Sequence, residues 1–246
     1  MSKNVLPEQL AFLKLSFILQ HHENLAAEAA QKHLSHIHYL SQLIDGESDL
    51  RQDRATQRRI QQARFPLPKT LEQFQWSWPK KINRPAIQHL FGLQFAKDKA
   101  NVIFLGGVGL GKSHLSIALG YEACLRGFSV LFTSAIDAIN TLTAAQASGR
   151  LKSELHKYTK PNILVLDEVG YLPINKSGAD LLFQIISHRY ERGSIIITTN
   201  RAFKNWPDIF NQDATLTSAI LDRLLHHSSN IVIEGKSFRM KDQINE

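Results

Sequence analysis

Hydrophobic side chains follow two different periods along the chain, and the change falls near residue 86. In residues 1 to about 64 they recur at the spacing of an α-helix, in a background rich in Ala, Leu, Gln and Glu. One such row consists of Leu34, Ile37, Leu40 and Ile44. From about residue 86, short apolar runs alternate with helical patterns. The sequence therefore predicts a small helical N-terminal domain followed by an α/β core.

A turn signal interrupts the helical region. Asp45-Gly46 favours a helix stop, so we expect a second helix from about residue 49 to residue 64. In that helix Arg51, Arg54 and Arg58 would share one face, because residues three or four apart lie on the same side of an α-helix.

Prolines mark the end of this region. Phe65-Pro66-Leu67-Pro68 ends the second helix, because proline cannot continue a helix and restricts the residue before it. We expect residues 65–85 to link the helical domain, 1–64, to the core, 86–246. Trp76 and Trp78 would hold this linker against a neighbouring surface.

Five apolar runs in the second part are predicted to be strands. They are nearly continuous in apolar residues, which is typical of parallel strands buried on both faces and covered by helices. These runs are Val102–Leu105, Ser129–Thr133, Ile163–Leu166, Ile195–Thr199 and Ile231–Ile233.

A glycine-rich loop follows the first of these strands and opens a helix, His114–Leu125. It fits the phosphate-binding pattern G-x-x-x-x-G-K-[ST] in the context that the pattern requires. Glycines let the backbone approach phosphate closely, and the free N–H groups at the helix start then bind the anion. The predicted nucleotide-binding residues are Gly106, Gly107, Val108, Gly109, Leu110, Gly111, Lys112, Ser113 and His114.

Polar residues at the ends of two other strands complete the predicted chemistry. Asp167 ends a buried strand and is expected, with the hydroxyl of Ser113, to hold Mg²⁺. Glu168, one residue further, is the candidate base that activates the attacking water, and Lys112 would reach the β- and γ-phosphates. Asn200 would bind the γ-phosphate or that water. For Asn200 a simple turn-forming role remains the alternative.

The nucleotide is predicted to be ATP and the reaction hydrolysis. A guanine-reading N-K-x-D sequence is absent, and Glu168 directly follows the metal-binding Asp167. Arg223 could stabilise charge on a neighbouring subunit's nucleotide, as arginines supplied in trans do in phosphoryl transfer. An ion pair with Asp222 or another acid is the alternative.

Composition sets limits on the location of the protein. Of 246 residues, 43% are hydrophobic and 21% charged, as in ordinary globular proteins. No run is long and apolar enough to span a membrane, and we see no secretory signal. Cys124 is the single cysteine and cannot form an internal disulfide. A reducing, cytoplasmic location is expected, with no membrane partner.

The charge is concentrated in one stretch. The chain carries a formal +7, and the segment from Arg51 to Arg84 has nine basic against two acidic residues. This segment is a candidate surface for DNA phosphates, through Arg51, Arg54, Arg58 and Arg59. A second candidate lies between the second and third strands, with Arg150, Lys152 and Lys157. In both places an ordinary solvated face is an equal alternative.

Several segments together resemble one protein family, the IstB-like AAA+ ATPases that help insertion-sequence transposition and are related to DnaC helicase loaders and DnaA initiators. The resemblance covers most of the chain. Besides the phosphate loop, it is carried by Ala63-Arg64-Phe65-Pro66, Leu166-Asp167-Glu168-Val169-Gly170-Tyr171-Leu172-Pro173, Arg189-Tyr190-Glu191-Arg192-Gly193-Ser194, Thr199-Asn200-Arg201, Ile220-Leu221-Asp222-Arg223-Leu224-Leu225-His226-His227 and Glu234-Gly235-Lys236-Ser237-Phe238-Arg239.

The resemblance implies a five-stranded parallel AAA+ sheet, with the strand before Asn200 between those before Lys112 and Asp167. It also implies ATP-dependent assembly into homo-oligomers on double-stranded DNA, activation of a partner transposase, and Arg223 as arginine finger. A conventional C-terminal lid is not expected, and Arg239 is a weak substitute for a lid arginine, with a surface ion pair as alternative. A replicative helicase loader and a monomeric nucleotide-metabolising enzyme remain alternative functions.

The histidines do not indicate a functional site as clearly as the motifs above. The group His33, His36 and His38 has no joining cysteine and does not share one helical face, so we predict no metal site there. His226 and His227 are expected to be structural or near a subunit interface.

Overall fold

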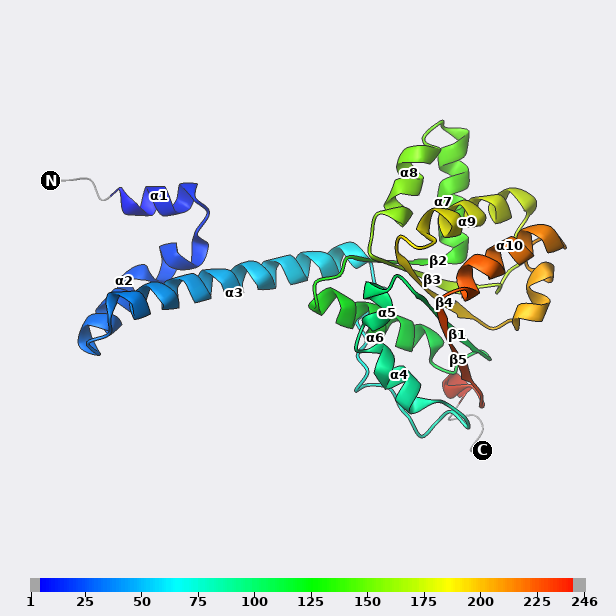
Figure 1. Ribbon diagram of the computed structural model, residues 1–246, viewed down its shortest axis with the longest axis horizontal. Coiled ribbons are helices and arrows are strands. Elements are labelled where there is room, and N and C mark those ends of the chain that lie inside the picture. Colours follow the sequence, from blue (N-terminus) through cyan, green and yellow to red (C-terminus); the bar gives the residue numbers. More distant parts are fainter. Residues whose placement is uncertain (1–4, 241–246) are drawn as a thin grey trace. The chain divides into compact units, whose positions relative to one another are not determined.

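The computed structural model describes residues 5–240 (Figure 1). These residues form two compact units, which divide between Arg58 and Arg59. The division falls within the long helix α3, His36–Ala63, so this helix contributes residues to both units. Residues 65–85, expected to be a linker, belong to the second unit.

The first unit consists of α1, Leu6–Phe12, α2, Ser16–Gln31, and most of α3. Its core is small and is formed by Leu10, Ile18 and Leu43. Of the predicted helical row, Ile37, Leu40 and Ile44 lie in α3 but have exposed side chains. Leu34 lies in the connection between α2 and α3, so for this residue the prediction is wrong.

The expected turn at Asp45-Gly46 is wrong, because α3 runs through both residues without a break. Gly46 lies against the ring of Phe17 in α2, and a Cβ atom at Gly46 would come within 2.1 Å of that ring. The glycine therefore lets two helices approach closely. Its contact with α2 outweighs the local preference of Asp-Gly for a turn.

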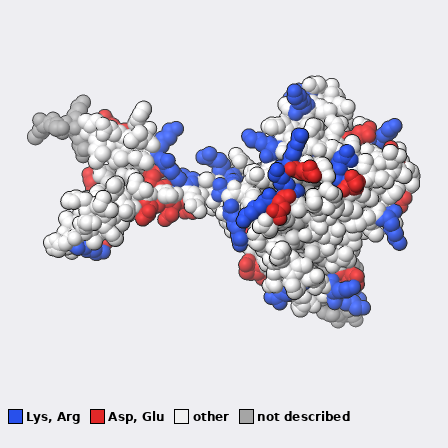
Figure 2. Space-filling model, viewed as in Figure 1, with Lys and Arg blue, Asp and Glu red and all other residues white. Residues whose placement is uncertain are grey.

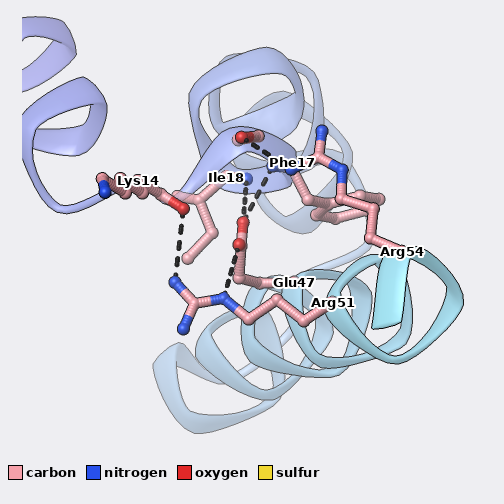
Figure 3. A network of polar contacts seen from close by, with 7 residues as sticks. Lys14, Phe17, Ile18, Glu47, Arg51 and Arg54 are labelled. Carbon is pink, nitrogen blue, oxygen red and sulfur yellow. Dashed lines mark hydrogen bonds and ion pairs between the residues drawn. The ribbon is translucent and has the colours of Figure 1, made fainter. Parts of the chain in front are cut away.

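Glu47 connects the same two helices by polar contacts (Figure 3). No side chain caps α2 from its own N-cap position. Instead the Glu47 carboxylate accepts hydrogen bonds from the backbone N–H groups of Phe17, at 2.8 Å, and Ile18, at 3.5 Å. A negative charge at a helix N-terminus is favourable, so Glu47 acts as a cap supplied from α3.

The second unit contains a five-stranded parallel sheet in the order β2-β3-β4-β1-β5. The predicted strands are confirmed with small shifts at their ends, and β4 lies between β1 and β3 as expected. The strands are β1, Asn101–Gly106; β2, Val130–Ser134; β3, Ile163–Val169; β4, Ser194–Thr199; and β5, Ser228–Ile233.

Helices cover both faces of the sheet (Figure 1). Alternate strand residues face opposite layers, so Ile103 packs in one core and its neighbours Val102 and Phe104 in the other. One layer holds α4, Arg84–Leu90, α5, Gln94–Lys97, and α6, Lys112–Leu125. The other holds α7, Ala135–Ala147, α8, Leu151–Thr159, α9, Lys176–Arg189, the 3₁₀ helix η1, Phe203–Asp208, and α10, Ala214–Leu225.

The segment after α3 packs on the sheet unit through aromatic side chains. Phe74 is buried and Trp76 packs beside it in the layer of α6. The Trp78 indole donates a hydrogen bond to the carbonyl of Lys236 at 2.9 Å. Both tryptophans therefore hold this segment against a neighbouring surface, as predicted.

Two further features complete the second unit. After β5, the described residues contain one more element, the 3₁₀ helix η2, Phe238–Met240, and no helical lid. None of the described helices is both long and apolar enough to cross a bilayer.

Candidate nucleotide site

The phosphate loop connects β1 to α6 with a backbone that glycine makes possible. Gly109 and Gly111 have φ angles of +75° and +85°, in the left-handed region that other residues rarely adopt. A Cβ atom at Gly109 would also lie 2.1 Å from the Ser237 hydroxyl, so the loop has no room for a side chain there. The first turn of α6 begins at Lys112, which leaves its N–H groups available to an anion.

A cavity of about 610 Å³ opens above this loop. Most of the predicted nucleotide-binding residues line it, and so do three of the five predicted catalytic residues, Lys112, Glu168 and Asn200. The lining includes Val108, Gly109, Leu110, Gly111, Lys112, Ser113, His114, Glu168 and Asn200. Gly106 and Gly107 form the start of the loop, where β1 ends.

Lys112 reaches back over the loop, where its ammonium group donates a hydrogen bond to the Gly107 carbonyl at 2.7 Å. Burial lowers the pKa of Lys112, and the nearby carboxylates of Asp167 and Glu168 oppose that shift. The Lys112 side chain is thus within the electrostatic reach of both acids that the sequence analysis paired with it.

The two acids lie at an irregularity at the end of β3. Between Leu166 and Val169 this strand gains one residue relative to β4, and Glu168 has a φ of +59°. Such a bulge redirects side chains, and strained backbone is concentrated at functional sites. Asp167 is consequently buried, whereas the Glu168 side chain is exposed and lines the cavity.

Thr198 of β4 holds both acids in place. Its hydroxyl donates to an Asp167 carboxylate oxygen at 2.5 Å and accepts from the backbone N–H of Glu168 at 2.9 Å. Thr198 was missed by the sequence analysis. The available signal was a hydroxyl two residues before Asn200, but its role depends on the pairing of β3 with β4.

Asn200 lines the cavity, and one of its side-chain atoms has no partner. Its side-chain oxygen is buried and has no hydrogen-bond partner among the described residues. Buried polar atoms are nearly always paired, so this oxygen is suited to a bound ligand or water. The Asn200 oxygen, the phosphate loop and the two carboxylates together fit a nucleotide with a bound metal ion.

The other walls of the cavity come from segments distant in sequence. His114 bonds to the Thr70 carbonyl at 2.9 Å and packs edge-on against Phe74. Burial lowers the pKa of the His114 imidazole. The remaining lining residues are mostly from residues 66–79, namely Pro66, Leu67, Pro68, Lys69, Gln73, Phe74, Gln75, Trp78 and Pro79.

The C-terminal segment closes one side. The Phe238 N–H donates to the Gly109 carbonyl at 2.9 Å, and the Phe238 ring meets Trp78 edge-on. Arg239 also lines the cavity and is near enough to lower the pKa of Lys112. Among the ion pairs of residues 5–240 none involves Arg239, so its expected alternative, a surface ion pair, is not seen.

Arg223 lies elsewhere. It belongs to the last turn of α10, where its guanidinium bonds to the Ala219 carbonyl at 2.9 Å and lies 5.0 Å from the centre of the Phe183 ring. It lines a separate depression and not the nucleotide cavity. The alternative ion pair with Asp222 is absent from the described contacts.

The candidate DNA residues of the first unit differ in their availability. Arg51 bonds to Glu47 and to the Lys14 carbonyl, and Arg54 bonds to Ser16 (Figure 3). Both arginines therefore support the helix packing. Arg58 is exposed.

The candidate DNA residues of the second unit lie in α3 and in or next to α8. Arg59 donates to the Cys124 carbonyl at 3.0 Å. Arg150 and Lys152 are exposed at the start of α8, and Figure 2 shows basic side chains at the tip formed by α7 and α8. Lys157 pairs with Glu154 at 2.7 Å.

Comparisons with known proteins give the family. The model of the family described as IstB-like ATP binding protein matches residues 8–246. A Pseudomonas aeruginosa protein of insertion sequence IS21, with a proposed ATP-binding role, is 42% identical over 95% of this chain and 88% of its own length.

Solved structures give the fold. The replication initiator DnaA bound to AMPPCP and single-stranded DNA has a TM-score of 0.56 and 24% identity, covering 72% of this chain and 54% of that one. The DnaC helicase loader has a TM-score of 0.55 and 21% identity, covering 67% and 96%. The chain therefore belongs to the IstB-like ATP-binding protein family of insertion sequences, and its sheet unit has the AAA+ fold of DnaA and DnaC.

Proposed function

We propose that the protein is an ATPase that assembles on double-stranded DNA in an ATP-dependent manner and activates a partner transposase. The observation that carries the proposal is one cavity lined by the phosphate loop, Glu168, Thr198 and Asn200, with the buried Asp167 bonded to Thr198 behind this lining. Membership in an insertion-sequence family supports the transposition role.

Two parts of the cavity wall would bind the phosphates and the adenine ring of ATP. The phosphates would bind the N–H groups at the start of α6, with Lys112 released from Gly107 to reach them. The apolar wall of Phe74, Trp78 and neighbouring prolines would pack against the adenine ring. Arg239 would add a second positive charge beside the phosphates.

Hydrolysis would use groups that the strands hold in fixed positions. Ser113 and Asp167 would hold Mg²⁺, which when bound neutralises charge on the phosphates. Glu168 would take a proton from the attacking water, and Asn200 would orient that water by accepting its other hydrogen. Thr198 would keep both carboxylates in register, because its hydroxyl contacts Asp167 and the Glu168 backbone.

Arg223 would act on the nucleotide of a neighbouring subunit. Within one chain it lines a different depression, so it cannot contact a nucleotide in the cavity described above without a second copy. A cation supplied in trans stabilises the charge of the transition state and makes hydrolysis depend on assembly.

DNA binding is proposed for exposed basic residues that have few internal contacts. In the first unit Arg58 is the stronger candidate, because Arg51 and Arg54 bond within the unit. In the second unit Arg150 and Lys152 are exposed. Contacts to phosphates would be independent of sequence and weaken steeply with salt.

The test uses Glu168→Gln, which should bind ATP without hydrolysing it. We expect this variant to bind duplex DNA tightly, cooperatively and only with ATP, across a salt series. Glu122→Gln, on the α6 surface away from the cavity, is the matched control and should hydrolyse ATP like the unchanged protein. Hydrolysis by Glu168→Gln at the unchanged rate would refute the assignment of the base.

A replicative helicase loader remains the second candidate, because DnaC shares the fold over nearly its whole length. Preference of the Glu168→Gln variant for single-stranded DNA, or no DNA binding at all, would favour this function over the transposition role.

A further inference from the structure

Three side chains that can bind a metal ion come together where the turn between α9 and β4 meets the end of α10. Potential ligand atoms of Glu191, His226 and His227 all lie within 4.8 Å of one another, and no other such group occurs within residues 5–240. In a tetrahedral zinc site with bonds of about 2.1 Å, the ligand atoms are about 3.4 Å apart. The upper limit of 4.8 Å exceeds that spacing, so these exposed side chains would rotate to bind one ion.

The backbone that carries these side chains is firmly held. Glu191 has a φ of +58°, in a turn where the next two N–H groups bond to the Arg189 carbonyl. Arg189 is fully buried, and its guanidinium donates to the carbonyls of Asn162, just before β3, and Ser194, the first residue of β4. The His227 carbonyl accepts from the N–H of Asn101 at 2.8 Å. Ligands on such supports are preorganised.

Tyr190 gives His226 a hydrogen-bond partner of the kind that supports histidine ligands in metal sites. Its hydroxyl lies 3.0 Å from Nδ1 of His226, which leaves Nε2 of that ring available as a ligand. Metal-bound histidines nearly always have such a partner on their other nitrogen, because it fixes the ring and its tautomer. The rings of His226 and His227 are 4.1 Å apart.

We propose that Glu191, His226 and His227 form a site for one Zn²⁺ ion. Two imidazoles and one carboxylate are a known zinc ligand set, and they leave the fourth position open. The basic residues Lys97, Lys99 and Arg223 line the adjacent depression with Glu191 and His227. Asp98 lines the same depression and offsets part of their positive charge. The two imidazole ligands favour Zn²⁺ over Mg²⁺, which prefers oxygen ligands.

The site adjoins Arg223, so a bound ion would order the side chains beside the proposed arginine finger. The binding itself does not rest on the proposed function. It can be measured on the full chain without nucleotide or DNA, so the two proposals can fail separately.

The test is a zinc titration of the untagged full chain, in competition with a coloured chelator, and a parallel titration with Co²⁺. We expect one equivalent of Zn²⁺ to bind, and Co²⁺ to give the strong visible absorption of four-coordinate sites. His227→Gln and Glu191→Gln should weaken zinc binding more than tenfold. Tyr190→Phe should weaken it about 10–100-fold, as loss of an outer partner does elsewhere.

His156→Gln is the matched control, since it removes an exposed histidine of α8 outside the group, and it should bind zinc unchanged. Zinc should also raise the melting temperature of the unchanged protein but not that of His227→Gln. The proposal is overturned if the unchanged protein gives no four-coordinate Co²⁺ spectrum. It is equally overturned if the bound equivalent persists in both His227→Gln and Glu191→Gln.

Discussion

Thr198 shows how much a single hydroxyl can contribute to the candidate site. It is almost fully buried, and its oxygen is shared between the carboxylate of Asp167 and the backbone N–H of Glu168. Both acids lie in the bulge at the end of β3, where the ladder to β4 is interrupted. The hydroxyl therefore replaces the regular strand contact that the bulge removes.

We expect Thr198→Val to lower the turnover of ATP at least tenfold and to change ATP affinity little. Valine keeps the shape of threonine but leaves the Glu168 N–H unsatisfied, which should also reduce the free energy of unfolding by about 1–3 kcal/mol. Steady-state hydrolysis and equilibrium binding of a fluorescent ATP analogue separate the two effects.

Thr133→Val is a suitable control, because Thr133 lies on β2, which pairs with the other edge of β3, and its hydroxyl bonds to the adjacent Ser134 carbonyl. It should leave turnover unchanged. Equal losses in both variants would mean that Thr198 acts through general packing and not through the two acids.

At the scale of elements, the sequence pattern predicted the five strands correctly but placed a turn within the continuous helix α3. The five strands follow from runs of apolar residues, because burial on both faces dictates composition directly. The Asp45-Gly46 signal failed, since Gly46 is needed for contact with Phe17, a residue of another helix. The roles of Thr198 and Phe238 were likewise not predictable, because they depend on pairing with Asp167 and Gly109 across the fold.

Gly46→Ala tests this reading of α3. Alanine is a better helix former by about 1 kcal/mol, but here its Cβ would collide with the Phe17 ring. Overpacking of this kind costs about 1–3 kcal/mol, so we expect the variant to loosen the first unit. Faster hydrogen exchange of the amides of α2 and α3 would report it.

The effect of Gly46→Ala should change from destabilising to stabilising when the Phe17 ring is removed. In a Phe17→Ala background, Gly46→Ala has no ring to meet and should slow hydrogen exchange in α3, because only the helix preference remains. If Gly46→Ala has the same effect in both backgrounds, the contact with Phe17 does not explain the glycine.

The cap that Glu47 supplies to α2 should make the first unit sensitive to acid. Burial raises the pKa of Glu47, but hydrogen bonds from Arg51 and from the N–H groups of Phe17 and Ile18 outweigh it, so the pKa is lowered from 4.5. A lowered pKa stabilises the fold above the unfolded value and loses this effect as pH falls through the folded value. The packing of α2 should therefore weaken below about pH 4.5.

Glu47→Gln should remove this part of the pH dependence and weaken the packing already at neutral pH. Circular dichroism and amide exchange of α2 between neutral and acidic pH would measure it. Glu23→Gln, an exposed change in α2 itself, should retain the acid response of the unchanged protein.

At the scale of the whole molecule, the chain separates the groups that hydrolysis is proposed to need. Lys112 and Glu168 line one cavity, while Arg223 lines another depression. If the proposal is right, each active site is shared between two copies in a head-to-tail contact, which uses different surfaces of the two partners. ATP turnover should then depend on protein concentration.

Mixing two inactive variants tests this sharing directly. Lys112→Ala lacks the phosphate-binding lysine but offers an intact Arg223, and Arg223→Ala offers the reverse. In a random equal mixture about a quarter of head-to-tail interfaces combine both intact residues, so a corresponding share of turnover should return. Mixing Arg223→Ala with the double variant Lys112→Ala/Arg223→Ala supplies no arginine and should stay inactive. Recovery in neither mixture, with both variants still assembling on DNA, would show that Arg223 does not complete a neighbour's site.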